Sequence, residues 1–298
     1  MTLITARPRR SILYMPGTNA KALERAKTLP TDGVILDLED AVAPEAKEEA
    51  RVAVARMVKA GGYGNREVII RVNALNSPWG PADLEAAIEA GPDAILFPKL
   101  STSLEVIAAH EAMEALGARP SMNLWAMIET PRAILEIASI ASASTDTRLS
   151  TFVMGTNDLA KETRARLTPD RTAFHYALSA SVTAARLYGL TIIDGVYNDI
   201  SNVEGFAEMC WQGLNFGFDG KTLIHPSQLE TCNTIFAPSA EEVAHARAVI
   251  AAFADPANAG KGVLKVDGKM TELLHLEMAQ RTFAIAEAIH TRALDGES

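Results

Sequence analysis

Short apolar runs alternate with longer amphipathic segments along most of the chain, in the rhythm of repeated βα units. The runs are rich in Val, Ile, Leu and Phe, and the segments between them are rich in Ala, Glu, Lys and Arg. We expect strands at residues 11–15, 33–38, 68–72, 94–98, 123–128, 151–154, 191–195 and 213–217. Eight strands with intervening helices over about 220 residues match the count and length of a (β/α)8 TIM barrel.

The segments between these runs have the apolar spacing of helices, and several carry the residues that begin or end one. Thr130 and Pro131 combine a hydroxyl cap with a proline in the first turn, while Gly117 and Gly189 are typical of helix ends. We expect helices at residues 19–28, 43–58, 82–89, 103–115, 131–142, 172–188 and 201–211.

After His225 and Pro226 the strand rhythm stops and a helical tail follows, with helices expected at residues 239–253 and 270–292. Between these helices, Asp267-Gly268 predicts a tight hairpin turn. We therefore divide the chain into a barrel catalytic domain, residues 1–235, and a C-terminal helical extension, residues 236–298. We expect the extension to cap its own active site or that of a neighbouring subunit.

Composition narrows the class of partner. The chain is 48% hydrophobic and 22% charged, which is ordinary globular usage. A formal charge of −9 argues against nucleic acid or an anionic membrane as the partner and favours a small molecule. No secretory h-region and no uninterrupted apolar stretch of membrane-spanning length occurs, so we expect a cytoplasmic protein. The two cysteines, Cys210 and Cys232, have no paired spacing that indicates zinc or a disulfide framework.

Polar residues follow almost every expected strand, and the carboxyl ends of barrel strands share one mouth. Each could singly be a solvated loop charge or a helix cap, but several carboxylates brought together need a counter-ion. The residues concerned are Asp37, Glu39, Asp40, Arg71, Asn73, Lys99, Glu129, Asp158, Asp194, Asp219 and Lys221.

Glu129 and Asp158 follow adjacent strands, so their side chains can converge on one ion. Oxygen ligands without nearby histidine or cysteine favour Mg²⁺, with Mn²⁺ as the alternative. Gly155 allows close backbone approach, and the N–H groups of the turn 155–158 are expected to receive a substrate carboxylate. Arg71 offers a bidentate fork for a second oxygen anion or a developing enolate.

Other catalytic signals are weak or missing. His225 is the only histidine expected near the mouth, and its simpler interpretation is a structural loop residue. The sequence contains no GxSxG, P-loop or GxGxxG motif, so serine hydrolysis, nucleotide hydrolysis and dinucleotide redox chemistry lack their usual signatures.

Six motifs, in this order, resemble the citrate lyase beta-chain-like CoA-ester lyases of the HpcH/HpaI aldolase superfamily. The resemblance covers about residues 10–287. The motifs are RSILYMPG at 10–17, DLEDAV at 37–42, RVN at 71–73, MIET at 127–130, GTNDL at 155–159 and GKTLIHP at 220–226.

The resemblance implies a TIM barrel assembled as a homotrimer or hexamer, with Mg²⁺ on Glu129 and Asp158. It also implies that Asp37, Glu39 and Asp40 support the metal-bound waters, and that CoA lies across the mouth. The residues expected to contact the substrate are Arg71, Glu129, Gly155, Thr156, Asn157 and Asp158. Candidate CoA contacts are Lys21, Lys27 and Arg10, each of which is equally well explained as a surface cation.

The late motif departs from the family pattern. Many relatives carry Gly-x-Met-x-Asp, whose aspartate acts at the CoA acyl carbon, often in a neighbouring subunit, whereas Gly268 to Glu272 ends here in glutamate. The longer side chain keeps the basic group but moves it, and a shift of about 1 Å can cost on the order of 10²-fold in rate. We assign the acid–base role to Glu272, and the alternative is an exposed residue at a helix start.

The implied reaction is reversible Claisen-type cleavage of a 3-hydroxyacyl-CoA such as L-malyl-CoA into acetyl-CoA and glyoxylate. One alternative is hydrolysis of the (3S)-malyl-CoA thioester. A further alternative is a citrate lyase beta subunit that acts on an acyl-carrier-protein thioester. In each case the partners are a thioester and a small 2-oxo or hydroxy acid. Glyoxylate with acetyl-CoA identifies a lyase, and malate with free CoA identifies a thioesterase.

Overall fold

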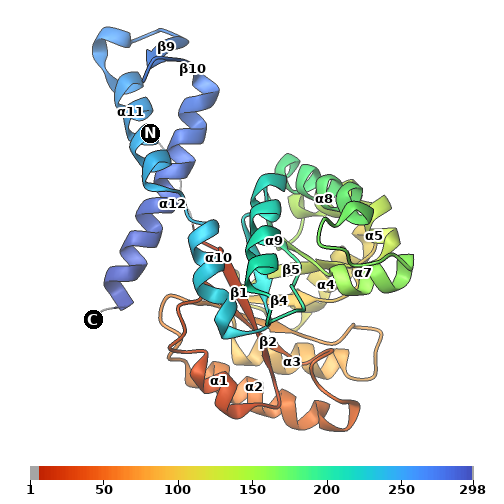
Figure 1. Ribbon diagram of the computed structural model, residues 1–298. Coiled ribbons are helices and arrows are strands. Elements are labelled where there is room, and N and C mark those ends of the chain that lie inside the picture. The colour runs from red at the N-terminus through yellow and green to blue at the C-terminus, as the bar shows by residue number, and fades with distance from the viewer. Residues whose placement is uncertain (1–6, 297–298) are drawn as a thin grey trace. The chain divides into compact units, whose positions relative to one another are not determined.

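The structure, a computed structural model, describes residues 7–296 (Figure 1). Eight parallel strands close into a barrel in which each strand pairs with the next and the last pairs with the first. They are β1 (Ser11–Pro16), β2 (Gly33–Asp37), β3 (Glu67–Arg71), β4 (Ala94–Phe97), β5 (Asn123–Ile128), β6 (Leu149–Met154), β7 (Thr191–Asp194) and β8 (Gly220–Leu223). The predicted TIM barrel with a C-terminal helical extension is confirmed.

The expected eighth strand, residues 213–217, is wrong. These residues end helix α9 (Val203–Phe216), in which Gly213 is buried and Gly217, at φ 96°, forms a left-handed C-cap. The run resembles a short strand because the half-buried Leu214 and Phe216 stand between two glycines at a helix end. The observed strand β8 contains Lys221, whose side chain is fully buried, so hydropathy alone does not indicate it.

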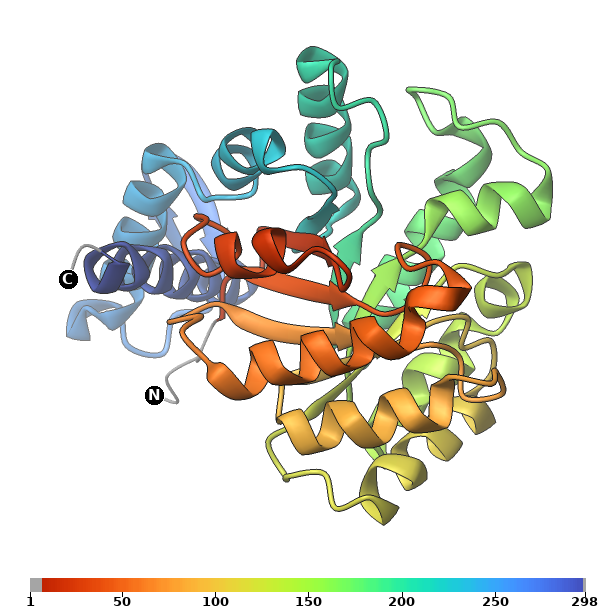
Figure 2. The ribbon, with the colours of Figure 1, turned by 90° about the horizontal axis from the view of Figure 1, so that it is seen from below.

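Helices surround the barrel strands, as Figure 2 shows. The helices that precede α9 are α1 (Ala20–Arg25), α2 (Lys47–Ala60), α3 (Gly80–Ala90), α4 (Ser103–Ala115), α5 (Pro131–Leu135), α6 (Ile137–Ser142), α7 (Thr156–Thr163) and α8 (His175–Leu187), and α10 (Leu229–Ile235) follows it. The predicted cap at Thr130 is confirmed, since its side chain accepts from Ala133 N. Helices α7 and α10 lie outside the expected helices.

The barrel interior consists of apolar side chains that alternate along each strand, among them Ile35, Ile69 and Met127. Side chains of a strand alternate between its two faces, so the residue two positions further on points to the same side. Those residues are charged: Asp37, Arg71 and Glu129 come two positions after the three apolar residues. The strand period therefore directs these side chains to the barrel mouth, above the apolar core.

Residue contacts divide the chain into two compact units, Arg9–Asn233 and a second unit with residues 7–8 and 234–296 of the described chain. In the second unit, α11 (Ala240–Ala254) and α12 (Leu273–Gly296) lie side by side (Figure 1). The hairpin β9 (Val263–Val266) and β10 (Lys269–Glu272) separates them in sequence. Asp267 and Gly268 have φ 49° and 79° at its turn, which confirms the predicted hairpin.

Within residues 7–296, no helix combines the length and apolarity needed to cross a bilayer.

Candidate active site

Glu129 directly follows β5 and is buried at the mouth of the barrel. Its Oε1 accepts a hydrogen bond from the Lys99 peptide N–H at 2.8 Å, whereas its buried Oε2 has no hydrogen-bond partner in the part of the chain that the structure describes. Burial, together with the charges of Glu39 and Asp158, raises the pKa of Glu129 to about 8. A buried carboxylate with one free oxygen is suited to receive a cation.

Asp158 lies in the first turn of α7, close enough to Glu129 for its charge to act there. Gly155 connects β6 to this helix, and a Cβ at this position would collide with Cβ and Oε2 of Glu129. A glycine is therefore required here for the Glu129 side chain to take its observed position. Among residues 7–296 no three His, Cys, Asp or Glu side chains form a metal cluster. A set of two carboxylates fits Mg²⁺, which takes its remaining ligands from substrate and water.

Arg71 is buried at the end of β3 and is held by two carboxylates. Its Nε and Nη2 donate to the two oxygens of Asp37, both at 2.6 Å. Its Nη1 lies 2.7 Å from Glu39 Oε2, an ion pair that is not aligned as a hydrogen bond. The fork that we predicted for a substrate oxygen is thus occupied by Asp37, which also accepts from the N–H groups of Glu39 and Ala41. A substrate contact by Arg71 stays a prediction. Because Nε and Nη2 donate to Asp37, we expect such a contact at Nη1.

Glu39 is a further buried carboxylate of the mouth, and sequence reasoning did not identify the residue that holds it. Lys99 Nζ donates to Glu39 Oε1 at 2.8 Å, and Lys99 has a left-handed backbone with φ 57°. Its position after β4 was visible in the sequence, but its conformation was not. Asp40 is exposed and its carboxylate lies 3.7 Å from Arg71 Nη1. Support of metal-bound waters by Asp37, Glu39 and Asp40 stays a prediction.

Lys47 is a second residue that sequence reasoning missed. Its buried ammonium donates to the carbonyl oxygens of Leu38 and Glu39 and to Asn73 Oδ1, at 2.8–2.9 Å. These three bonds fix the loop that carries Glu39. In the sequence Lys47 belongs to a charged helical segment and resembles a surface residue, so no local signal identifies it.

Three charged residues that we expected at the mouth have other roles. Asp194 ends β7 out of phase with the interior residues, and its buried carboxylate binds Lys221 Nζ at 2.8 Å and Arg171 Nη1 at 2.7 Å. In the β1–β8 register, Lys221 lies opposite Ser11, which begins β1. Asp219 forms an ion pair with Arg186. These groups stabilise the barrel wall and are not mouth residues. The prediction was wrong for Asp219 and Lys221 because the eighth strand was misplaced. It was wrong for Asp194 because this side chain points to the opposite face of β7 from the interior residues.

Two further candidates also have structural partners. His225 caps the turn that follows β8, with Nδ1 2.8 Å from Ser227 Oγ, in agreement with its simpler interpretation. Arg10 binds Asp32 through two guanidinium nitrogens at 2.9 Å, so this candidate for a CoA contact is a structural cation. Lys27 pairs with Glu24 at 3.0 Å, whereas Lys21 is exposed.

The segment from Thr156 to Asp158 forms the amino-terminal turn of α7, whose N–H groups have no carbonyl partner within the helix. Thr156 is buried, and Asn157 forms two reciprocal amide hydrogen bonds with Asn198 at 3.1 and 2.8 Å. This pair joins the first turn of α7 to the loop that follows β7. The turn is thereby held in place, and its predicted binding of a substrate carboxylate stays a prediction.

Glu272, the predicted acid–base residue, is exposed at the end of β10 in the second unit. Its peptide N–H donates to His275 Nδ1 at 2.9 Å, so it lies at the start of α12. Its catalytic role stays a prediction.

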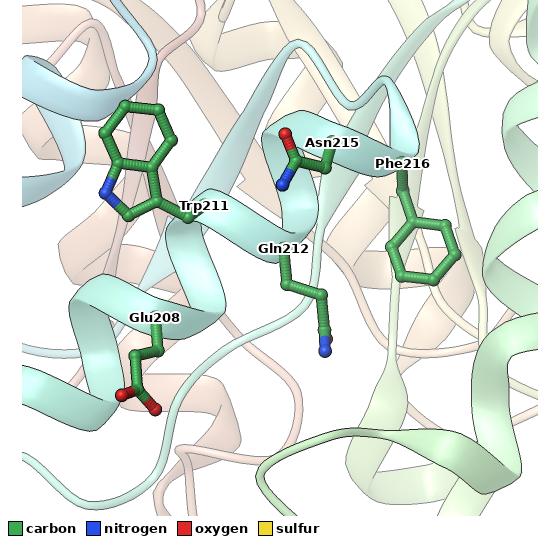
Figure 3. A pocket seen from close by; sticks show the side chains of 5 residues that line it. All are labelled: Glu208, Trp211, Gln212, Asn215 and Phe216. Atoms are coloured by element: carbon green, nitrogen blue, oxygen red, sulfur yellow. The ribbon is translucent and has the colours of Figure 1, made fainter.

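A hollow on the outer surface of α9 is separate from the mouth (Figure 3). Its side chains come from successive turns of this one helix: Glu208, Trp211, Gln212, Asn215 and Phe216. It brings no set of convergent charged groups together, so the mouth is the stronger candidate for an active site.

Comparison with known proteins shows the family of the chain. The sequence model of the HpcH/HpaI aldolase/citrate lyase family matches residues 10–226. The chain belongs to this family. The match covers the whole barrel, including Arg71, Glu129 and Asp158, and confirms the resemblance drawn from the six motifs.

Relatives that are similar over nearly their full length include a thioesterase and a lyase subunit. The chain is 49% identical to a (3S)-malyl-CoA thioesterase of Cereibacter sphaeroides over 95% of this chain and 96% of the relative. It is 36% identical to the citrate lyase subunit beta of Escherichia coli, over 94% of each chain. The crystal structure of protein CitE from Mycobacterium tuberculosis in complex with magnesium, acetoacetate and coenzyme A is also similar. It has a TM-score of 0.75 and 27% identity, over 95% of this chain and all of that one.

Proposed function

We propose that the protein is a Mg²⁺-dependent CoA-ester lyase, which catalyses reversible Claisen-type cleavage of a 3-hydroxyacyl-CoA such as L-malyl-CoA. The observation that carries the proposal is the buried Glu129 Oε2, which accepts no hydrogen bond from the described chain and which the charge of Asp158 reaches. The substrate class is supported by the relatives, since one is a malyl-CoA thioesterase and a similar structure is a complex with magnesium and coenzyme A.

The acid half of the substrate would lie between the two carboxylates and the first turn of α7. When bound, Mg²⁺ would supply Lewis acidity to the hydroxyl and carboxylate oxygens of this half. The N–H groups of Thr156, Asn157 and Asp158 would orient its carboxylate at the positive end of the helix. In cleavage, the C3 hydroxyl would lose its proton to water and become the carbonyl of glyoxylate, while the C2–C3 bond breaks and its electron pair passes to the thioester enolate.

The thioester half requires a positive charge and a proton donor. Arg71 would stabilise the enolate electrostatically, because its guanidinium is fixed before the reaction by Asp37 and Glu39. Burial alone would lower the pKa of Arg71, but the surrounding carboxylates raise it well above its ordinary value, so the charge persists. Glu272 would then donate a proton to the enolate carbon, which yields acetyl-CoA and glyoxylate.

We also propose that the enzyme is a homo-oligomer, a trimer or hexamer. The second unit exposes several apolar side chains around its hairpin and the start of α12, and an apolar surface of this kind is typical of a protein contact. They are Val263, Met270, Leu273, Leu274 and Met278. Docking of this surface on another copy would bring Glu272 to that copy's barrel.

Hydrolysis of the malyl-CoA thioester is the second candidate, because the 49% identical relative is a thioesterase. In this reaction Glu272 would direct water to the thioester carbonyl carbon. A third candidate, a citrate lyase beta subunit acting on an acyl-carrier-protein thioester, is supported by the 36% identical relative. It predicts stable co-purification with partner chains and little turnover of free CoA esters.

One incubation separates the candidates. The purified protein is mixed with malyl-CoA and Mg²⁺, and glyoxylate and free thiol are measured in the same tube. Glyoxylate without free thiol supports the lyase, and free thiol without glyoxylate supports the thioesterase. Absence of both products would refute the proposed action on malyl-CoA.

A further inference from the structure

Glu39 is a third carboxylate beside the two expected metal ligands, and both of its oxygens face cations. It is 6% exposed, and its charge acts on Glu129. Lys99 Nζ donates to its Oε1 at 2.8 Å, and Arg71 Nη1 lies 2.7 Å from its Oε2. Each oxygen of this carboxylate is therefore paired with a positive side chain.

The backbone of Lys99 has a conformation that L-residues rarely adopt. Within residues 7–296, four non-glycine residues have positive φ, and three of them cap a helix or form the hairpin turn: Arg164, Arg171 and Asp267. Lys99, with φ 57°, is the one that follows a barrel strand. Strain of this type persists only where the surrounding contacts fix it, and it is common at functional sites.

The strained conformation gives Lys99 two simultaneous contacts at the site. Its peptide N–H donates to Glu129 Oε1 at 2.8 Å, while its ammonium donates to Glu39 Oε1 at the same distance. One residue thus sets the orientation of an expected metal ligand and holds the neighbouring carboxylate. No other described residue contacts both carboxylates by hydrogen bonds.

The number of carboxylates on a magnesium ion affects how a substrate binds. Mg²⁺ requires near-octahedral coordination and typically takes one or two carboxylates, with the remaining positions for water and substrate. A third carboxylate would occupy a position that a chelating hydroxy acid needs. It would also strengthen binding of the ion itself, because each added negative charge attracts it.

We propose that Lys99 is a positioning residue that withholds Glu39 from the metal, so that Glu129 and Asp158 remain its only carboxylate ligands from the chain. The inference rests on the proposed metal function of these two residues. Loss of a residue that merely supports the metal site would weaken Mg²⁺ binding, whereas this role of Lys99 predicts the opposite change. Its loss should strengthen Mg²⁺ binding and weaken binding of the acid.

The test measures Mg²⁺ binding by titration calorimetry on the full-length, EDTA-treated protein without substrate, then glyoxylate binding with Mg²⁺ present. Lys99→Met should bind Mg²⁺ at least threefold more tightly and glyoxylate at least threefold more weakly than the wild type. The same change made in a Glu39→Gln background should alter neither constant by more than the error, because the third carboxylate is gone.

Two further variants keep the test valid if Lys99→Met folds poorly. Lys99→Gly and Lys99→Ala both remove the ammonium and keep the peptide N–H, but only glycine relieves the positive φ. Both should reproduce the tighter Mg²⁺ binding, and Lys99→Gly should unfold at a higher urea concentration than Lys99→Ala.

Unchanged or weaker Mg²⁺ binding in Lys99→Met and Lys99→Gly would overturn the inference. An equal gain in the Glu39→Gln background would also overturn it, because the effect would then be simple loss of a positive charge. If the wild type itself binds no Mg²⁺, the proposed function fails together with the inference. If the wild type binds Mg²⁺ and the Lys99 variants match it, only the inference fails.

Discussion

Gly155 makes room for Glu129, and adding a single methyl group there tests the geometry of the mouth. The Cβ of Gly155→Ala would overlap Cβ and Oε2 of Glu129, while the φ of −103° at this position is accessible to alanine. Backbone strain therefore adds little, and the effect comes from the collision. Overpacking of this type costs about 1–3 kcal/mol of stability.

The catalytic effect should exceed the effect on stability. The overlap requires a shift of Glu129 by roughly 1 Å, and a misplacement of that size lowers the rate by on the order of 10²-fold. Turnover of malyl-CoA and unfolding in urea would be measured on the same preparation. Gly262→Ala is the matched control, because a Cβ there meets no atom within 4 Å and should change neither quantity. Wild-type turnover and Mg²⁺ affinity in Gly155→Ala would refute the packing argument.

Three other sets of variants test the remaining parts of the structure. Asp194→Ala leaves two buried cations without their partner and should lower the free energy of unfolding by about 3–5 kcal/mol in urea titrations; full stability would contradict the wall role. Burial opposes the charge of Asp194, but its cations lower its pKa, so the wild type should lose this stabilisation as the pH falls below about 4, and Asp194→Asn should not. Arg71→Lys loses the paired contact with Asp37 and should reduce kcat by about 10²-fold; an unchanged kcat would exclude a role for the planar fork. A mixture of inactive Glu272→Gln and inactive Glu129→Gln should recover activity if the proton donor acts in a neighbouring subunit, and no recovery after subunit exchange would place it in its own.

The barrel could be predicted because its strands are buried on both faces and contain few polar residues. Seven expected strands agree with the structure within two residues at each end. The eighth failed because β8 contains the fully buried Lys221, whose compensation by Asp194 comes from a strand far away in sequence. The Asp267-Gly268 hairpin was predictable, since its turn depends on two adjacent residues.

The sequence predicted which residues lie at the candidate site better than it predicted which partners they contact. Strand phase places Asp37, Arg71 and Glu129 at the mouth, and this phase follows from the sequence. Whether the fork of Arg71 faces a substrate or Asp37 depends on side-chain geometry that no local pattern encodes. The positive φ of Lys99 is equally hidden, because sequence signals for that conformation come mainly from glycine and asparagine.

The central claim is that Glu129 and Asp158 hold the Mg²⁺ on which turnover depends. The most direct measurement is Mg²⁺ titration of the EDTA-treated wild type and of Glu129→Gln, with malyl-CoA turnover followed at each Mg²⁺ concentration. We predict saturable binding and Mg²⁺-dependent turnover in the wild type, and loss of both in Glu129→Gln. Full turnover of Glu129→Gln, or of the wild type in excess EDTA, would contradict the claim.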